Sequence, residues 1–217
     1  MSLDHWYIYG AGGLGIETMD ILQSAIRRGQ QKPHHCAFIV DHPTATEVLG
    51  FPVVAVGDHV PGAKVTIAVG EPFARKALLE KVEGLGLVLQ SIFSPYAFIS
   101  DYAEIADGVI VAPHVSIQAT AKIGRNVAIN TASILGHDIV VEENCVVSSM
   151  VNLGGGTRVG MLSYLGMGAL VKERVQIGHS SIVGMGSVVH IDIPDEVIAL
   201  GNPARVVRRN EDKKVFK

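Results

Sequence analysis

An aliphatic residue recurs at every sixth position through the middle and later part of the chain. Steps of six from Ile99 to Val189 give sixteen positions, and every one is Leu, Ile or Val. If about one residue in three were of these types, such a run would arise by chance with odds on the order of 10⁻⁸. The period is therefore a property of the fold.

The six-residue period predicts short strands joined by corners. The residue four places after each aliphatic one is usually small or β-branched, and glycine often follows the aliphatic residue directly, as at Gly136 and Gly178. Glycine tolerates the backbone angles that a sharp corner requires. Three such sides close one coil, and roughly five coils stacked about 4.8 Å apart would enclose the aliphatic column.

The region before the repeats is of a different kind. Residues 1–95 alternate short apolar runs with amphipathic helical patterns, which is typical of an α/β fold. We therefore divide the chain into a first domain, 1–95, and a repeat domain with a C-terminal extension, 96–217. Strands are expected at 6–9, 37–40 and 65–69, helices after the first strand and at 71–82, and a connecting apolar run at 87–93.

Three glycines follow the first expected strand and open the first expected helix. The spacing of Gly10, Gly12 and Gly15 satisfies the GxGxxG pattern, whose backbone N–H groups can face a phosphate at a helix N-terminus. Asp41, at the end of the next strand, is placed to bind a ribose or a base. NAD binding by an oxidoreductase is one interpretation, but residues 1–95 hold only half of a dinucleotide fold. A purely structural glycine turn is another.

The order of the two parts resembles a known family. A glycine-fingerprint α/β domain joined to hexapeptide repeats is similar to the sialic acid O-acetyltransferases and the bacterial UDP-amino-sugar N-acetyltransferases. The motifs that carry the resemblance are Tyr9-Gly10-Ala11-Gly12-Gly13, Ile67-Ala68-Val69-Gly70, Ile123-Gly124-Arg125-Asn126, Ile129-Asn130-Thr131-Ala132-Ser133, Gly136-His137-Asp138 and Gly201-Asn202-Pro203-Ala204.

This resemblance implies both a fold and an activity. The fold is a Rossmann-like α/β domain with a short parallel sheet, followed by a left-handed parallel β-helix. The activity is acetyl transfer from acetyl-CoA to a sugar, either a nucleotide-linked amino sugar or a sialic-acid-type sugar, by a homotrimer. The implied nucleotide site consists of Gly12, Gly13, Leu14, Asp41 and Gly70, with Asn130 on the substrate side. The implied acetyl-CoA site consists of Gly166, Met167, Met185 and Gly186.

His137 is the candidate general base. It lies on a corner two residues past Leu135, and imidazole titrates near neutral pH, as a base for thioester acyl transfer requires. Asp138 can orient the ring and stabilise its charged form. Gly155, 18 residues later, leaves room for the pantetheine arm of CoA beside it. A surface histidine is the alternative from the residues alone; the resemblance implies a catalytic base at a subunit seam.

Two positions depart from the family pattern. Leu14 stands where some members carry histidine in the glycine loop, and Val146 stands where many place a second histidine. These departures keep open a second function, a non-catalytic β-helix scaffold that binds nucleotide sugars. They also leave open the identity of the sugar and whether its acceptor atom is oxygen or nitrogen.

Composition and charge argue against several other classes of function. A net charge of −3 gives no reason to expect nucleic acid, and the apolar runs fall short of the roughly 20 residues that cross a bilayer. Cys36 and Cys145 suggest no disulfide framework, and no secretory leader is recognisable, so a cytoplasmic location is expected. A metal is not expected either, because a trimeric β-helix carbonic anhydrase would need three converging histidines.

Overall fold

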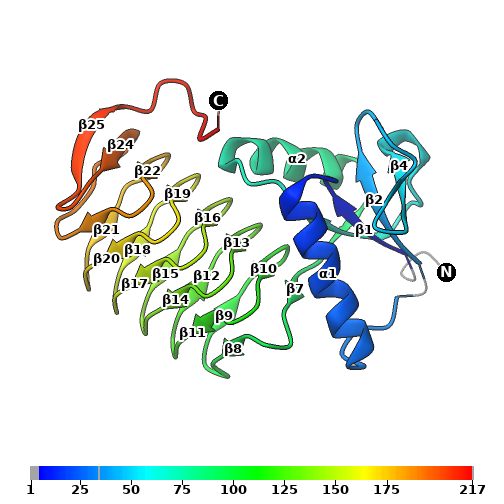
Figure 1. Cartoon of the computed structure of the whole chain (residues 1–217), viewed down its shortest axis with the longest axis horizontal. Helices are drawn as coiled ribbons and strands as arrows, with labels where there is room; N and C mark the ends of the chain where they lie inside the picture. The colour runs from blue at the N-terminus through cyan, green and yellow to red at the C-terminus, as the bar shows by residue number, and fades with distance from the viewer. Residues whose placement is uncertain (1–4, 34, 217) are drawn as a thin grey trace.

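The computed structural model describes residues 5–33 and 35–216. Its first part is a six-stranded sheet in the order β3-β4-β2-β1-β5-β6, parallel except for the β3–β4 pair (Figure 1). A short 3-10 turn, Val56–Asp58, follows β4. The elements are β1 (His5–Tyr9), α1 (Gly13–Arg27), β2 (His35–Val40), β3 (Glu47–Val48), β4 (Phe51–Ala55), β5 (Lys64–Ile67), α2 (Pro72–Gly84) and β6 (Val88–Leu89).

Alternate residues of β1 face the two helices. Trp6 and Ile8 are buried together with Met19 of α1, whereas Tyr7 and Tyr9 are buried in a cluster that contains Leu79 of α2. Because successive side chains of a strand point to opposite faces, β1 is covered on both sides. The predicted α/β fold is confirmed, and the expected strands and helices are present with ends shifted by a few residues. The β3–β4 hairpin was not expected.

The rest of the chain is a β-solenoid with three faces. On the first face β7 (Ile92–Phe93), β10 (Ile110–Val111), β13 (Ala128–Ile129), β16 (Val146–Val147), β19 (Tyr164–Leu165), β22 (Ile182–Val183) and β24 (Val197–Leu200) pair in parallel. The second face holds β8 (Phe98–Ile99), β11 (Ser116–Ile117), β14 (Ile134–Leu135), β17 (Asn152–Leu153), β20 (Leu170–Val171) and β23 (Val188–Val189). The third holds β9 (Glu104–Ile105), β12 (Lys122–Ile123), β15 (Val140–Val141), β18 (Arg158–Val159) and β21 (Gln176–Ile177). A final strand, β25 (Arg205–Arg209), pairs antiparallel with β24.

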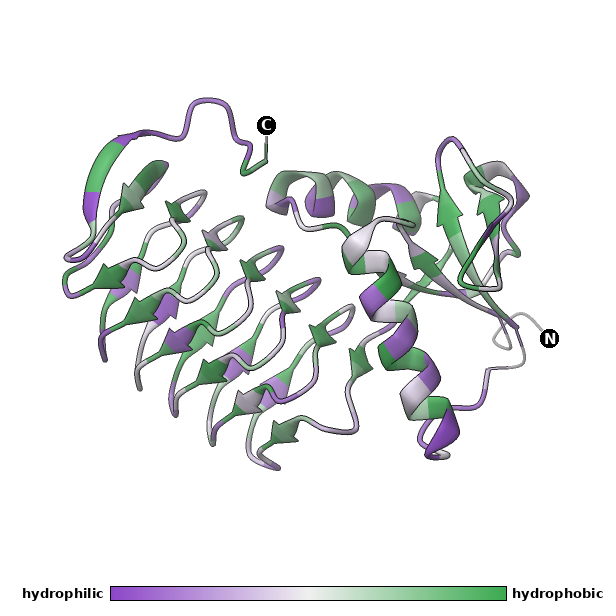
Figure 2. Cartoon of the chain, viewed as in Figure 1, coloured by the Kyte–Doolittle hydropathy of each residue, from purple (hydrophilic) through white to green (hydrophobic). Residues whose placement is uncertain are grey.

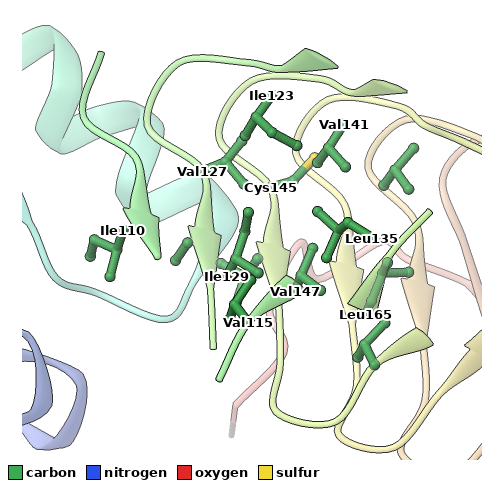
Figure 3. Packing of buried hydrophobic residues seen from close by; sticks show 14 of the residues in the cluster. Ile110, Val115, Ile123, Val127, Ile129, Leu135, Val141, Cys145, Val147 and Leu165 are labelled. Atoms are coloured by element: carbon green, nitrogen blue, oxygen red, sulfur yellow. The ribbon is translucent and has the colours of Figure 1, made fainter. Parts of the chain in front are cut away.

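The aliphatic column fills the interior, as the period predicts. Leu135 pairs with Ile117 on one side and Leu153 on the other, and all three side chains are fully buried. Figure 3 shows labelled members of this column converging inside the coils. Ile99 and Ile105, in the first coil, are only partly buried. The stack extends beyond the predicted repeats at both ends, through β7 and β24.

The residues that carry the left-handed backbone angle at the corners are not the glycines that the sequence predicted. The left-handed backbone angle lies two residues after the glycine, as at Asp138, whose φ is 58°. At Gly136 a side chain is excluded by space instead, because a Cβ would stand 2.8 Å from the backbone nitrogen of Gly155 in the next coil. The left-handed angle recurs every sixth residue at His114, Thr120, Asn126, Ala132, Asp138, Asn144, Met150, Gly156, Leu162, Gly168, Arg174, Ser180 and Gly186.

The outward residues make the three faces chemically different, and Figure 2 colours each residue of the ribbon by its hydropathy. The first face is covered, so that Ile110 and Ala128 are fully buried. The second face exposes apolar side chains, among them Phe98, Ile134 and Leu170. Outward positions of the third face are mainly charged or polar and include an ion pair between Lys122 and Glu104. Only the second face is therefore both apolar and open to solvent.

A buried arginine joins the α/β layer to the solenoid. The guanidinium of Arg75, on α2, donates hydrogen bonds to the carbonyl oxygens of Ile67 and Val69 and to the backbone and side-chain oxygens of Asn126. Burial lowers the pKa of Arg75 to about 9, so the group remains charged at neutral pH. One hydrophobic core also spans both parts. The division of the chain at residue 95 stays a prediction, because pairing and packing do not measure independent folding.

Candidate functional site

His137 and Asp138 form a dyad on the corner between the second and third faces. The Nδ1 atom of His137 lies 2.7 Å from Oδ2 of Asp138. Both side chains are largely exposed, at 71% and 64%. If Nδ1 carries the proton and donates it to the carboxylate, the Nε2 lone pair remains free to accept one.

Thr120, in the preceding coil, holds the carboxylate of this dyad. Its hydroxyl donates to Oδ1 of Asp138 over 2.6 Å and accepts the backbone N–H of the same residue over 3.2 Å. These bonds stabilise the ionised form. The pKa of Asp138 is lowered, first by the Thr120 hydrogen bond and then by the one to His137.

Gly155, in the following coil, leaves the space that the imidazole of His137 occupies. A Cβ on Gly155 would lie 2.6 Å from Nε2 and 2.7 Å from Cε1 of His137. Real Cβ atoms do not make contacts this short, so the ring occupies space that exists only because residue 155 is glycine. The predicted site residue thus contacts the histidine itself, while its role toward CoA stays a prediction.

The glycines of the loop have two different roles: Gly15 allows close packing, whereas Gly12 and Gly13 leave open space. A Cβ on Gly15 would stand 2.0 Å from the carbonyl oxygen of Gly10, so helix α1 can approach the loop only without a side chain there. Gly12 and Gly13 have no atom within 4 Å of the corresponding position. Gly12 is the N-cap of α1 and Gly13 its first residue. Open space therefore lies beside the unpaired N–H groups of a helix N-terminus, which suit an anion.

A cavity of about 310 Å³, the junction cavity, lies between α1 and the first face. It collects Gly13, Leu14, Gly70 and Asn130, four of the residues that the sequence assigned to the acceptor. The side-chain oxygen of Asn130 is buried and has no hydrogen-bond partner among the described residues. The cavity is also lined by Val146, one of the two departures from the family pattern, and by Glu17, Ser148, Tyr164 and Phe216, which sequence reasoning missed.

Asp41 is engaged elsewhere. Its carboxylate forms an ion pair with Lys81 and accepts a hydrogen bond from Tyr9 over 2.8 Å. These partners, Lys81 first, lower the pKa of Asp41. Burial and the bond to Asp41 raise the pKa of the Tyr9 phenol. Asp41 does not line the junction cavity, so its role toward a nucleotide stays a prediction.

A larger cavity of about 850 Å³, the tail cavity, lies along the same face under β25. Gly166, Met167 and Met185, three of the predicted acetyl-CoA residues, line it, whereas Gly186 and Gly155 do not. Arg208 and Lys214 add positive charge to its wall, and Asp212, which pairs with Arg208, adds negative charge. Tyr164 and Phe216 line both this cavity and the junction cavity. The two cavities are therefore neighbours that share one aromatic wall.

His137 is separated from both cavities within one chain. The cavities open on the first face and on the corner that joins it to the second face, whereas His137 lies on the far edge of the second face. Neither cavity includes His137 in its lining.

The described ranges, 5–33 and 35–216, contain no group of three or more His, Cys, Asp or Glu side chains arranged to hold a metal. None of the helices within them is long and apolar enough to cross a membrane.

The chain is similar to several known acetyltransferases over nearly its whole length. The GDP-perosamine N-acetyltransferase of Escherichia coli O157:H7 is 27% identical over 213 residues, which cover 94% of this chain and 96% of that protein. PerB from Caulobacter crescentus, solved in complex with CoA and GDP-perosamine, is 32% identical with a TM-score of 0.84, over 93% of this chain and 96% of that one.

A third relative was solved with the acetyl donor. The acetyltransferase domain of PglB from Neisseria gonorrhoeae FA1090, in complex with acetyl coenzyme A, is 29% identical with a TM-score of 0.87. The match covers 94% of this chain and 99% of that one. A scan against protein-family models found no match.

Proposed function

This chain belongs to the hexapeptide-repeat β-helix acetyltransferases, which use acetyl-CoA, and we propose that its acceptor is the amino group of a nucleotide-linked sugar. The observation that carries the proposal is the pair of cavities on one solenoid face. The junction cavity begins at the glycine loop and the N-terminus of α1, which suit the phosphates of a nucleotide. The tail cavity is the larger of the two and mainly apolar, and its wall carries Arg208 and Lys214, which suits the pantetheine arm and phosphates of acetyl-CoA.

The proposed chemistry needs one base. The amine nitrogen attacks the thioester carbonyl carbon, a C–N bond forms and the C–S bond breaks. His137 Nε2 takes the proton that nitrogen loses and returns it to the sulfur of CoA. Asp138, bound to Nδ1, fixes the ring orientation and stabilises the imidazolium that forms between these two steps.

A homotrimer would bring His137 to the cavities. In a threefold assembly with the second face toward the axis, the two corners beside that face meet in heterologous contacts. The corner that carries His137 then faces the corner of the neighbouring subunit that carries Asn130 and Met167. The exposed apolar side chains of the second face support this orientation, since apolar area is removed from water there.

The heights of the residues along the solenoid agree with this arrangement. Asn130 follows β13 and His137 follows β14, and these strands belong to the same coil. Threefold symmetry about an axis parallel to the solenoid keeps equivalent coils level. His137 of one subunit would therefore stand at the level of the junction cavity of its neighbour, where the sugar is proposed to end.

One observation favours the alternative function, a non-catalytic scaffold that binds nucleotide sugars. It concerns the two positions that depart from the family pattern. Leu14 and Val146 line the junction cavity in place of titratable side chains. The dyad favours catalysis, because Thr120 and Gly155 hold it in a defined geometry on an exposed corner where folding does not require it. We therefore prefer the enzyme.

An acetyl-CoA turnover assay tests the proposal. The purified chain is incubated with acetyl-CoA and GDP-perosamine, and in parallel with UDP-linked amino sugars and a sialic acid. CoA release and the mass of the acetylated product are followed. We expect product from at least one nucleotide-linked amino sugar. Binding of such sugars without turnover would support the scaffold, and turnover with sialic acid alone would assign the acceptor to a hydroxyl group.

A further inference from the structure

The segment 212–216, here called the tail strap, runs along the boundary between the two cavities. Lys214 and Val215 line the tail cavity, and Phe216 lines both cavities. Figure 1 shows the chain passing from β25 toward the N-terminal end of α2. The strap is therefore part of the wall of two sites that the proposed function assigns to different substrates.

Glu71, the residue before α2, anchors the tail strap. Its carboxylate accepts the backbone N–H of Val215 at 3.0 Å and that of Phe216 at 2.6 Å. The side chain makes no capping hydrogen bond to α2, so it is free for this role. The anchor is charge-assisted, which makes it stronger than a bond between neutral groups.

The ring of Phe216 makes a second attachment of the tail strap. It packs edge-on against Tyr164 with ring centroids 5.7 Å apart, and it lies 3.4 Å from where a Cβ on Gly70 would stand. Phe216 is nevertheless 56% exposed. Asp212 also pairs with Arg208, and Lys213 lies over the ring of Phe73. All residues of the strap except Val215 are exposed, so the segment belongs to the weakly held part of the structure, and its attachment responds to further contacts.

We infer that the tail strap couples the two substrate sites. A ligand in either cavity packs against Phe216 or the strap beside it and favours the attached state, which completes the wall of the other cavity. Coupling of this kind is reciprocal, so each ligand raises the affinity for the other by the same factor. The inference rests on the proposed function for the identity of the two ligands.

The coupling is tested by measuring the affinity for each ligand in the absence and in the presence of the other. The affinity of CoA is measured by calorimetry with and without saturating GDP-perosamine, and that of GDP-perosamine with and without CoA. In the wild-type chain we expect both Kd values to fall by the same factor, about 5-fold or more. In Glu71→Ala and Phe216→Ala that factor should approach one. Glu80→Ala, an exposed position on α2 away from the strap, is the matched control and should retain it.

A second measurement needs no ligand. Lys213 and Lys214 are trypsin sites within the strap, and proteolysis is faster where the chain opens locally, so Glu71→Ala should be cut faster there than the wild-type chain or Glu80→Ala. Equal cleavage rates would overturn the anchor. A coupling factor of one in the wild-type chain, or an unchanged factor in both variants, would overturn the inference. Failure of the proposed function shows differently, as absent acetyl-CoA turnover by the wild-type chain.

Discussion

The imidazole of His137 fills the space above Gly155, with Nε2 2.6 Å from where a side chain would begin. The next coil of the solenoid therefore leaves room for the ring in this position. Gly155→Ala should displace the ring without breaking the coil. Because a misplacement of about 1 Å can cost about 10²-fold, we expect kcat to fall by that order with a smaller change in KM. Steady-state kinetics on the acetyl acceptor measures both.

The control for this variant is Gly84→Ala, at the end of α2, where nothing lies within 4 Å of the added methyl group. It should leave kcat unchanged. A Gly155→Ala enzyme as active as the wild type would show that the ring position seen here does not matter for turnover.

Thr120 should act through Asp138. Thr120→Val keeps the shape but loses the hydroxyl that donates to Oδ1, the first cause of the lowered pKa of this carboxyl. The pKa of Asp138 should therefore rise toward its ordinary value, and kcat should fall several-fold. NMR titration of the carboxyl group checks the direction, and Thr120→Ser should restore both properties. Since the depressed pKa belongs to the folded state, its small stabilising effect is lost as pH falls through it.

A double-mutant cycle separates positioning from a structural role. Asp138→Asn alone should lower kcat less than loss of His137. Adding Thr120→Val to Asp138→Asn should then cost nothing further. Additive losses would mean that Thr120 acts independently of Asp138.

Arg75 should hold the two parts of the chain together. Arg75→Met leaves four oxygen acceptors on Ile67, Val69 and Asn126, three of them buried, without their donor. We expect the free energy of unfolding to fall by about 3 kcal/mol, because unsatisfied buried acceptors are costly. Urea unfolding measures this. Lys76→Met, the exposed neighbour on α2, should change it by no more than about 0.5 kcal/mol.

The second face should be the subunit interface. Leu170→Glu places a charge among its exposed apolar side chains and should dissociate the assembly. Sedimentation at micromolar concentration should show a trimer for the wild type and a smaller species for the variant. Gln176→Glu, on the third face, should leave the trimer intact. A wild-type monomer with full activity would contradict the proposed assembly.

The periodic parts of this fold were predictable because one physical rule repeats. The buried column follows from aliphatic residues six apart, and the β1–α1 unit follows from the glycine fingerprint after a strand. The handedness of the coil came only from family resemblance. The corner angles were assigned to the wrong residues, because a glycine can be required by a close backbone neighbour, as at Gly136, as well as by its own torsions.

The candidate site was predictable where it depends on motifs. Gly13, Leu14, Gly70 and Asn130 meet in one cavity, although Gly70 and Asn130 are far from the other two in the sequence. Phe216 and Lys214 belong to no repeat, so nothing in their spacing predicts that they reach the cavities. The outward positions Val146 and Tyr164 lie 18 residues apart on the first face, which is a signal that could have revealed that wall.

The most direct test asks whether His137 of one subunit serves the junction cavity of another. His137→Ala should lower kcat by about 10²–10⁴-fold with the fold intact, and Gly13→Val should block the cavity. Co-expression of the two variants gives mixed trimers in which about a quarter of the interfaces combine an intact cavity with an intact histidine. We predict that acetyl transfer recovers to about that fraction of wild-type activity. No recovery in verified mixed trimers, or a His137→Ala enzyme with wild-type kcat, would contradict the account.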